Sequence, residues 1–404
     1  MSIMEKKVGL LFSEDFSKYN FGKSHPLKPV RLELTYSLFK HLGLMDHPSL
    51  EVIAPQMASE SDLAMLHSEE YINIIKKLSE DPSTRGISYW KYNLGPGDNP
   101  IFKGMYEASA LIAGASIKGA EKIINEAEKY DIIFNPAGGL HHAHRDRASG
   151  FCVFNDIALA IMKMKKLKPE IRIVYLDIDA HHGDGVQWFY YNDPSVLTIS
   201  LHESGKYLFP GTGDVHEIGE KEGKNFSINF PLIPGTYDKL YLKLFRACIP
   251  ELLDIYSPDI LVTQLGVDSY YKDPLTQLGL SLSAYKELAG DIHQYSQKYC
   301  KNKWFAVGGG GYFVTLVPRA WSIFLAEMLG VKLDNELPQE WVKECYRSAP
   351  DEPHPEEMFD RSDAITLELL SHPELQKQMV DYINSLIEFC QENFVPNLKA
   401  ALNK

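Results

Sequence analysis

The chain has 404 residues, of which 45% are hydrophobic and 24% charged, and its formal net charge is −13 at pH 7. This composition is typical of a globular protein with a large core, and the negative charge argues against nucleic-acid binding through phosphate neutralisation. The five cysteines are scattered without a CxxC pair and no apolar run approaches the roughly 20 residues that span a bilayer, so we expect a cytoplasmic protein without a membrane segment.

Apolar runs that predict buried strands alternate with amphipathic helical patterns. The first stretch, MSIMEKKVGLLF, is too short and too charged for a signal peptide, and its second half predicts a strand. The alternation predicts an α/β fold with a single, mostly parallel sheet and helices on both faces. The predicted strands are Val8–Ser13, Ile132–Asn135, Ile171–Ile178, Val196–Leu201, Phe226–Phe230, Ile260–Gln264 and Trp304–Val307, and the clearest helices are Ala108–Lys129, Tyr237–Tyr256 and Ser283–Lys301.

Polar and glycine-rich motifs follow directly after many of these strands. Ligands of open α/β sheets bind beyond the carboxyl ends of the strands, so we expect these loops to share one site. In chain order the motifs are PAGGLHHAHRD, DAHHGDGV, HESGKYLFPGTGD, LGVDSYYKDP and GGGGY.

The last part of the chain lacks such motifs. The acidic, proline-rich stretch APDEPHPEEMFD predicts a loop or linker. A helix is predicted from Glu374 to Phe394, and one of its faces carries Leu375, Met379, Ile383, Leu386 and Cys390. We expect residues 331–404 to form a helical extension that packs on the main domain (residues 1–330) or on a partner subunit, which leaves homo-oligomers open.

The motif DIDAHHGDGV ends a strand that should be buried. Burying carboxylates without partners costs several kcal/mol, so a compensating group is expected. Alternate residues of an extended segment face the same way, so Asp177, Asp179 and His181 should point together and suit zinc or a similar divalent ion. Asp268, after the strand Ile260–Gln264, is a candidate third ligand, and three ligands leave a position open for water. A capped helix start with a hydrogen-bonded histidine remains the alternative for the motif, and an Asp that caps the next turn for Asp268.

Two histidines and a tyrosine complete the candidate chemistry. His141 and His142 would be an acid–base pair if carboxylates such as Asp177 and Asp184 tune them, although surface histidines are the simpler interpretation. Tyr312 follows four glycines and either donates a hydrogen bond to an oxyanion or packs in the core.

Together these motifs resemble the zinc-dependent histone deacetylase superfamily, especially its class I enzymes and the bacterial acetoin-utilisation deacetylases. The resemblance covers roughly Val8 to Leu329 and includes the further motifs HPLKPVR, LHSEEYI, GDNPIF, HHAHRDRASGFCVFND and LFPGTGD. It implies the arginase/deacetylase fold, a parallel sheet of about eight strands flanked by helices. The sequence departs from class I enzymes at HAHRDR, HESGKYL and DSYYKDPLTQLG, so the rim of the site is expected to differ.

The resemblance also implies roles for individual residues. Asp179, His181 and Asp268 would bind one zinc ion per chain, although iron is an alternative metal. His142, paired with Asp184, would be the general base, and His141, paired with Asp177, would stay protonated and help electrostatically. Tyr312 would donate to the substrate carbonyl. The implied substrate residues are Asp98 at the rim, Gly150, Phe151 and Phe209 in the walls of a narrow tunnel, Leu275 at its mouth, Gly310 beside the metal, and Arg31 in an internal channel for acetate.

The same family binds structural potassium through backbone oxygens. One site would involve Asp177, Asp179, His181, Ser200 and Leu201. A second would involve Tyr190, Asp193, Val196 and Phe226.

The expected activity is zinc-dependent removal of acetyl or related acyl groups from lysine side chains of proteins or peptides. Acetylpolyamines and small amides are alternative substrates. An arginase-type site with two manganese ions would need carboxylates where Gly183 and Tyr270 stand, so one metal is favoured. A non-catalytic acyl-lysine binder is disfavoured because His141, His142 and Tyr312 are all present.

Overall fold

The computed structural model describes residues 7–84, 86, 88–360 and 372–403. Within these residues eight strands form one sheet in the order β2-β1-β3-β8-β7-β4-β5-β6, and every neighbouring pair is parallel. The expected fold class is therefore confirmed. The strands are β1 Lys7–Leu11, β2 Leu50–Ile53, β3 Tyr130–Asn135, β4 Ile173–Asp177, β5 Val196–Glu203, β6 Ser227–Leu232, β7 Ile260–Gln264 and β8 Trp304–Val307.

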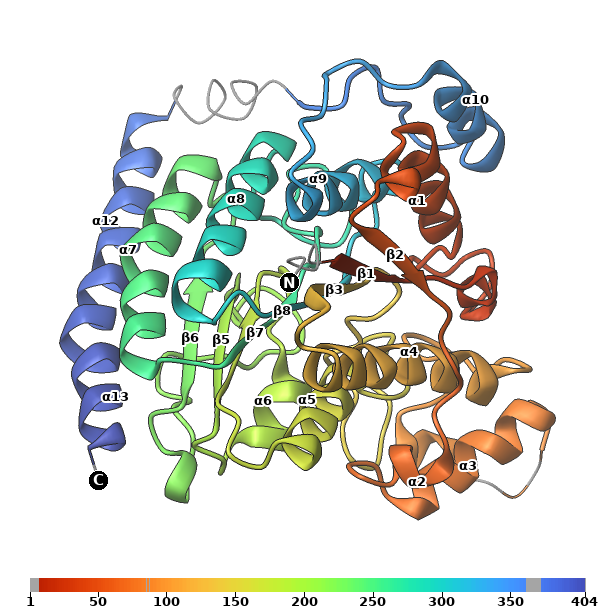
Figure 1. Cartoon of the computed structure of the whole chain (residues 1–404), viewed down its shortest axis with the longest axis horizontal. Helices are drawn as coiled ribbons and strands as arrows, with labels where there is room; N and C mark the ends of the chain where they lie inside the picture. Colours follow the sequence, from red (N-terminus) through yellow and green to blue (C-terminus); the bar gives the residue numbers. More distant parts are fainter. Residues whose placement is uncertain (1–6, 85, 87, 361–371, 404) are drawn as a thin grey trace, which may run out of the picture.

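Helices cover both faces of the sheet (Figure 1). On one face α9 packs against both α1 and α8, and α8 also contacts α7; on the other face α4 packs along α5. Each βα crossover buries an apolar helix face on the sheet, as parallel strands require. The helices are α1 Val30–His41, α2 Glu60–Leu63, α3 Glu69–Glu80, α4 Met105–Asn125, α5 Asp156–Leu167, α6 Asp184–Tyr190, α7 Asp238–Tyr256, α8 Leu282–Tyr299 and α9 Val317–Leu329, with short 3₁₀ turns at Glu14–Lys18, Leu44–Asp46, Tyr89–Tyr92 and Lys221–Gly223.

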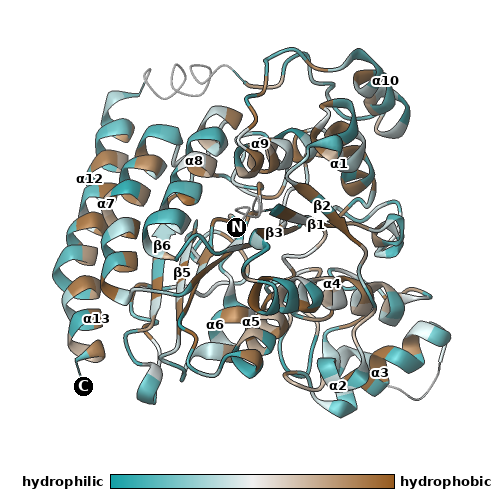
Figure 2. Cartoon of the chain, viewed as in Figure 1, coloured by the Kyte–Doolittle hydropathy of each residue, from teal (hydrophilic) through white to brown (hydrophobic). Residues whose placement is uncertain are grey.

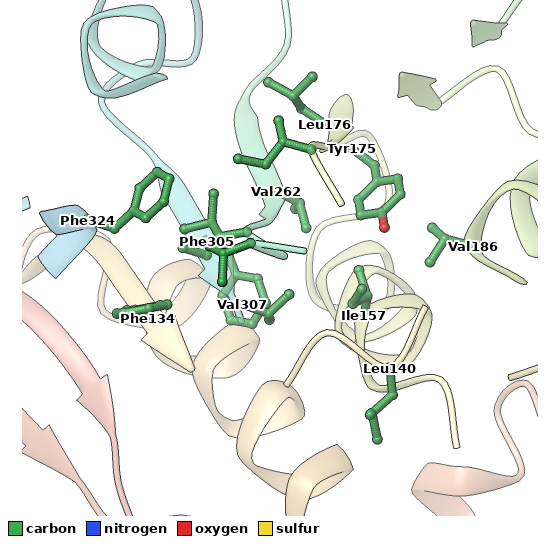
Figure 3. Close-up of a cluster of buried hydrophobic side chains, with 14 of the residues drawn as sticks. Phe134, Leu140, Ile157, Tyr175, Leu176, Val186, Val262, Phe305, Val307 and Phe324 are labelled. Atoms are coloured by element: carbon green, nitrogen blue, oxygen red, sulfur yellow. The ribbon is translucent and has the colours of Figure 1, made fainter. Parts of the chain in front are cut away.

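The central strands are buried along their whole length, which explains their continuous apolar sequences. Every residue of β4, β5, β7 and β8 is buried. Figure 3 shows part of the resulting core, in which Phe305 and Val262 of neighbouring strands lie near Phe134 and Phe324. This packing holds the carboxyl ends of the strands in fixed positions, so the loops that follow start from a rigid edge.

All seven predicted strands are present, with ends shifted by a few residues. The sequence interpretation missed β2, a four-residue edge strand with only two buried residues. Such a short, half-exposed segment carries little hydrophobic pattern. The three helices predicted between the strands correspond to α4, α7 and α8.

The C-terminal segment continues as α10 Gln339–Ser348, α12 Pro373–Phe389, a π-helical turn Cys390–Phe394 and α13 Val395–Leu402. Both α12 and α13 pack against α7 at the side of the molecule next to the edge strand β6 (Figure 1). Figure 2 shows hydrophobic and hydrophilic residues alternating along α12, as expected for an amphipathic helix. Met379, Ile383, Leu386 and Cys390 are buried, but Leu375 is 45% exposed. Leu375 therefore belongs to the predicted apolar face without being buried.

Among the described residues, no helix is long and apolar enough to cross a membrane.

Candidate active site

Loops after four neighbouring strands meet at the carboxyl edge of the sheet. The loop after β3 carries His141 and His142, the loop after β4 carries Asp179 and His181, and the loop after β7 carries Asp268. The glycine-rich loop after β8 closes the group. The sheet order places β3, β8, β7 and β4 side by side, so residues far apart in sequence converge there.

Asp179, His181 and Asp268 form a compact cluster. His181 Nδ1 lies 2.9 Å from Asp268 Oδ2 and 3.1 Å from Asp179 Oδ1. The candidate ligand atoms of all three residues lie within 4.8 Å of one another, and all three residues are buried. Two carboxylates thus converge on one nitrogen, which can donate only a single proton. An oxygen, nitrogen and oxygen donor set of this kind fits zinc or another first-row divalent ion.

The surroundings of the cluster leave room for these carboxylates and orient them. A Cβ atom at Gly310 would lie 2.1 Å from Asp268 Oδ2, so only glycine permits this approach. The Gly310 N–H donates to Asp179 Oδ2 at 2.8 Å, and Gln264 Nε2 donates to the same oxygen at 2.6 Å. Burial, and next the charge of Asp179, raise the pKa of Asp268 to about 7, so a cation bound here would be favoured as a counter-charge.

Asp177 does not point with Asp179 and His181, contrary to the expectation from alternation. Strand β4 ends at Asp177, and the chain then turns, so the two-residue period stops there. Asp177 instead accepts a hydrogen bond from His141 Nδ1 at 2.8 Å and one from the Tyr175 hydroxyl at 2.5 Å. It is therefore a partner of the first histidine.

Each of the two adjacent histidines has its own carboxylate. His142 Nδ1 donates to Asp184 Oδ1 at 2.6 Å, and the Nε2 atoms of His141 and His142 lie 3.0 Å apart. Burial alone would lower the pKa of His141, but Asp177 and then Asp179 outweigh it and raise this pKa to about 9. Burial, and next the charge of His141, lower the pKa of His142 to about 3. At neutral pH the pair thus holds one charged and one neutral imidazole, and the lone pair of the neutral ring is on Nε2, where it accepts from His141 Nε2.

Aromatic rings line the approach to this cluster. The Phe209 ring lies 5.0 Å from the His142 ring, and the Phe151 ring lies 5.6 Å from the Tyr312 ring. Gly150 has a φ of 47°, and a Cβ there would lie 2.4 Å from the His142 ring. Burial, and then the charges of Asp268 and Asp179, raise the pKa of Tyr312 well above its usual value, so its hydroxyl stays protonated.

The remaining substrate candidates lie around this approach. Asp98 is exposed on the loop before α4. Leu275 is half-buried, and its N–H donates to Asp273 at 3.0 Å. The buried Arg31 donates to the carbonyl oxygens of Gly309 at 2.8 Å and Gly311 at 3.0 Å, directly behind the glycine loop.

The candidate potassium residues lie on β4, on β5, at the end of α6 and in the neighbouring loops. Asp177 pairs in register with Ser200 on the adjacent strand. In the second group, Asp193 forms an ion pair with Lys165, and the Thr198 N–H donates to the Phe226 carbonyl at 3.0 Å. The other members are Asp179, His181 and Leu201 of the first group, and Tyr190 and Val196 of the second; all of these are buried.

Sequence reasoning missed several residues that hold the site in place. Buried Asp273 accepts hydrogen bonds from the backbone N–H groups of both Leu275 and Tyr312. Asn155 caps α5, and its Nδ2 donates to the His141 carbonyl at 3.1 Å. Asp156 accepts the Gly139 and Leu140 N–H groups and so fixes the loop before the histidines. The only sequence signal was their position inside polar motifs that follow strands.

Comparison with known proteins identifies close relatives. The histone deacetylase domain family matches residues 25–328. The chain is 39% identical over 343 residues to the acetoin utilization protein AcuC of Bacillus subtilis. The aligned region covers 84% of this chain and 87% of AcuC. It is 38% identical over 336 residues to histone deacetylase B of Dictyostelium discoideum, with 82% and 76% covered.

Solved structures agree with these matches. A homologue of histone deacetylases from Aquifex aeolicus superposes with a TM-score of 0.78 at 32% identity, over 88% of this chain and 95% of that one. A second homologue, solved in complex with SAHA, gives a TM-score of 0.82 at 31% identity, over 95% of this chain and 100% of that one. The likeness extends over nearly the whole fold described above.

Proposed function

This chain belongs to the histone deacetylase family, and on that premise we propose that it is a zinc-dependent amidohydrolase that removes acetyl or related acyl groups from lysine side chains of proteins or peptides. One observation carries the proposal. The Asp179–His181–Asp268 cluster lies beside two histidines that each have a carboxylate partner. This combination of a three-ligand metal centre with a neutral and a charged imidazole suits hydrolysis of an amide by water.

In this proposal Asp179, His181 and Asp268 hold one zinc ion per chain. When bound, zinc lowers the pKa of water and polarises a carbonyl group. Three protein ligands are typical of a catalytic rather than a structural zinc site. The second carboxylates of an arginase-type site are missing, since Gly183 and buried Tyr270 stand at those positions.

The residues around the metal centre then divide the proton transfers. His142 takes a proton from the attacking water through Nε2, because its Nδ1 proton is held by Asp184. The same residue returns a proton to the departing lysine amine. His141 keeps its charge beside Asp177 and stabilises the negative charge that develops in the transition state.

Tyr312 is proposed to donate its hydroxyl proton in a hydrogen bond to the oxygen of the scissile carbonyl. Its raised pKa keeps it a donor throughout the reaction. The aromatic rings of Phe151 and Phe209, together with Gly150, suit the unbranched methylene chain of lysine, and we assign the approach between them to that chain. Gly310 lets the carboxylates approach each other beside the metal.

Four further assignments belong to the proposal. Asp98 accepts hydrogen bonds from the substrate backbone at the rim, and Leu275 borders the mouth. Arg31 faces the glycine loop from behind, and its buried positive charge suits passage of the acetate product. The two groups of potassium candidates are proposed as structural cation sites.

The proposed location is the cytoplasm. All five cysteines are free and buried, which suits a reducing compartment. We propose no direct contact with nucleic acid, given the net charge of −13. Self-association through the C-terminal helices remains open to measurement.

A substrate panel tests the proposal. Acetyl-lysine and longer acyl-lysine peptides, acetylspermidine and acetylputrescine would be compared at equal concentration, with a hydroxamate inhibitor as control. We expect the acetyl-lysine peptide to have the highest kcat/KM and the hydroxamate to abolish turnover. Faster hydrolysis of the acetylpolyamines would replace the substrate assignment, and binding of peptides without any hydrolysis would indicate a binding protein.

A further inference from the structure

The segment before α1 contains a buried histidine that the mechanism above does not use. His25 is 6% exposed. Its Nδ1 accepts a hydrogen bond from the Leu27 N–H at 3.1 Å, and its Nε2 lies 3.2 Å from the carbonyl oxygen of Asp98. Since Nδ1 is an acceptor, the proton of the neutral ring is on Nε2, which donates to Asp98. Burial lowers the pKa of His25 and so favours this neutral form.

The same ring also packs on the tunnel wall. The ring centroids of His25 and Phe151 lie 4.5 Å apart at 77°, an edge-to-face contact. Phe151 has a φ of 68°, a conformation that a bulky residue adopts only when its surroundings hold it. Its N–H donates to Asn99 Oδ1 at 3.0 Å, and its carbonyl accepts from the Tyr19 hydroxyl at 2.6 Å. The wall is therefore fixed by three separate contacts.

Asn99 connects this wall to the rim turn that carries Asp98. Its side chain is buried and donates to the Asn93 carbonyl at 3.0 Å, and its own carbonyl accepts the Gly95 N–H at 2.9 Å. Gly95 and Gly97 have φ values of 121° and 113°, a backbone conformation that glycine adopts easily, so the turn has little stiffness of its own. Two links join the turn directly to Phe151 and its ring partner, Asn99 to Phe151 and His25 to Asp98, and Asn93 Nδ2 donates to the nearby Ala148 carbonyl at 3.0 Å.

We propose that His25 is a positioning residue that sets the exposed Asp98 carboxylate at a fixed height above the Phe151 wall, and thereby selects acyl-lysine within a peptide over small acylated amines. The inference rests on the proposed function, in which Asp98 accepts hydrogen bonds from the substrate backbone. A peptide presents backbone N–H groups beside the modified lysine, whereas an acetylated alkylamine presents none. Correct placement of Asp98 therefore strengthens binding only of substrates that have those N–H groups.

Two substitutions separate the two hydrogen bonds of His25. An asparagine side chain ends near the Nδ1 position, so His25→Asn keeps an acceptor for Leu27 and loses the donor to Asp98. A glutamine side chain reaches the Nε2 position, so His25→Gln keeps the donor. Wild type and both variants would be assayed with an acetyl-lysine peptide and with N-pentylacetamide, which has the same methylene chain but no N–H donor at the position of the lysine backbone, and the melting temperature of each variant would be recorded.

We expect His25→Asn to raise KM for the peptide about fivefold to tenfold, the effect of one lost hydrogen bond, with kcat unchanged within about twofold. His25→Gln should restore the wild-type KM to within about twofold. Neither variant should change KM for N-pentylacetamide. Equal KM changes on both substrates, no rescue by glutamine, or no change at all would overturn the proposal. If His25→Asn does not fold, His25→Phe keeps the ring contact and loses both bonds, and it should reproduce the peptide-only effect.

Asp98→Ala tests whether the effect passes through the rim carboxylate. In that background His25→Asn should raise KM for the peptide no further, because the group that it positions is gone. An additive effect of the two substitutions would contradict the inference. The affinity of the peptide can also be measured by calorimetry in His142→Ala protein with and without His25→Asn. This measurement needs no turnover, so it tests the role of His25 even if the wild type hydrolyses no substrate and the proposed function fails.

Discussion

The loops at the carboxyl edge of the sheet and the C-terminal helices are both well packed, but they are built by different kinds of contact. The loops hold buried carboxylates and imidazoles in short hydrogen bonds, such as those of His141 with Asp177 and His142 with Asp184. The helices α12 and α13 pack on α7 through apolar side chains such as Met379 and Ile383. In the loops, replacing one polar atom should change the reactivity of its hydrogen-bond partner. In the helices, removing apolar volume should lower the stability of the fold. Substitutions in the two regions should therefore affect different measurements.

The largest effect on turnover short of metal loss is expected from His142→Ala. It removes the proposed base, and general acid–base catalysis contributes about 100- to 10,000-fold, so kcat should fall by that order. Steady-state assays on an acetyl-lysine peptide measure it. The exposed His372, at the start of α12, offers a matched control, and His372→Ala should leave kcat unchanged. A fully active His142→Ala enzyme would refute the assignment of the base.

Tyr312→Phe should have the next largest effect. It deletes a single hydroxyl, and loss of one oxyanion donor costs about 100- to 1,000-fold in kcat. Metal content and melting temperature should stay at wild-type values, because the hydroxyl is not among the candidate ligands. Normal turnover in this variant would remove the tyrosine from the mechanism.

Asp177→Asn should move the pH profile of kcat/KM. The Asp177 carboxylate raises the pKa of His141, so its removal lowers that pKa from about 9. His141 then loses its charge at a lower pH, and the alkaline limb of the profile should shift toward neutrality. An unchanged alkaline limb would show that the charge of His141 does not contribute.

The smallest effect on turnover is expected from Ile383→Ala in α12. Ile383 is fully buried, and such a truncation costs about 2–5 kcal/mol of stability. The melting temperature should fall, while kcat and KM at 25 °C stay within about twofold of wild type. Leu375→Ala on the same helix is the matched control, because Leu375 is 45% exposed and its removal should change stability by less than about 0.5 kcal/mol. A change in kcat that exceeds the loss of folded protein would show that the extension reaches the site.

The same difference between the regions explains what the sequence could predict. The site motifs are legible because metal binding and proton transfer require particular side chains, and the sequence alone therefore indicates Asp179, His181 and Asp268, which the fold brings together. In the extension only a helical pattern could be seen, and it placed Leu375, which is 45% exposed, on the same apolar face as the buried residues. A helical pattern shows which face of a helix is apolar, but not which residues of that face are packed against the rest of the protein.

Within the site, the residues that could not be predicted are those that hold loops in position by binding their backbone. Asp273 binds two backbone N–H groups from separate loops, and nothing in its sequence context distinguishes it from a turn residue. The direction of Asp177 was also wrong, because the two-residue period of β4 stops at the strand's last residue. Chemistry that depends on residue type is visible in the sequence, whereas chemistry that depends on the path of a loop is not.

The central claim is that Asp179, His181 and Asp268 bind one catalytic divalent ion. The most direct test is elemental analysis of wild-type and Asp268→Asn protein together with their deacetylation rates, with Asp334→Asn, an exposed aspartate, as control. We expect about one zinc or iron ion per wild-type and control chain, and loss of both metal and turnover in Asp268→Asn. A wild-type enzyme that still cleaves acetyl-lysine at full rate after a chelator has stripped its metal, or one that holds two ions per chain, would contradict this account.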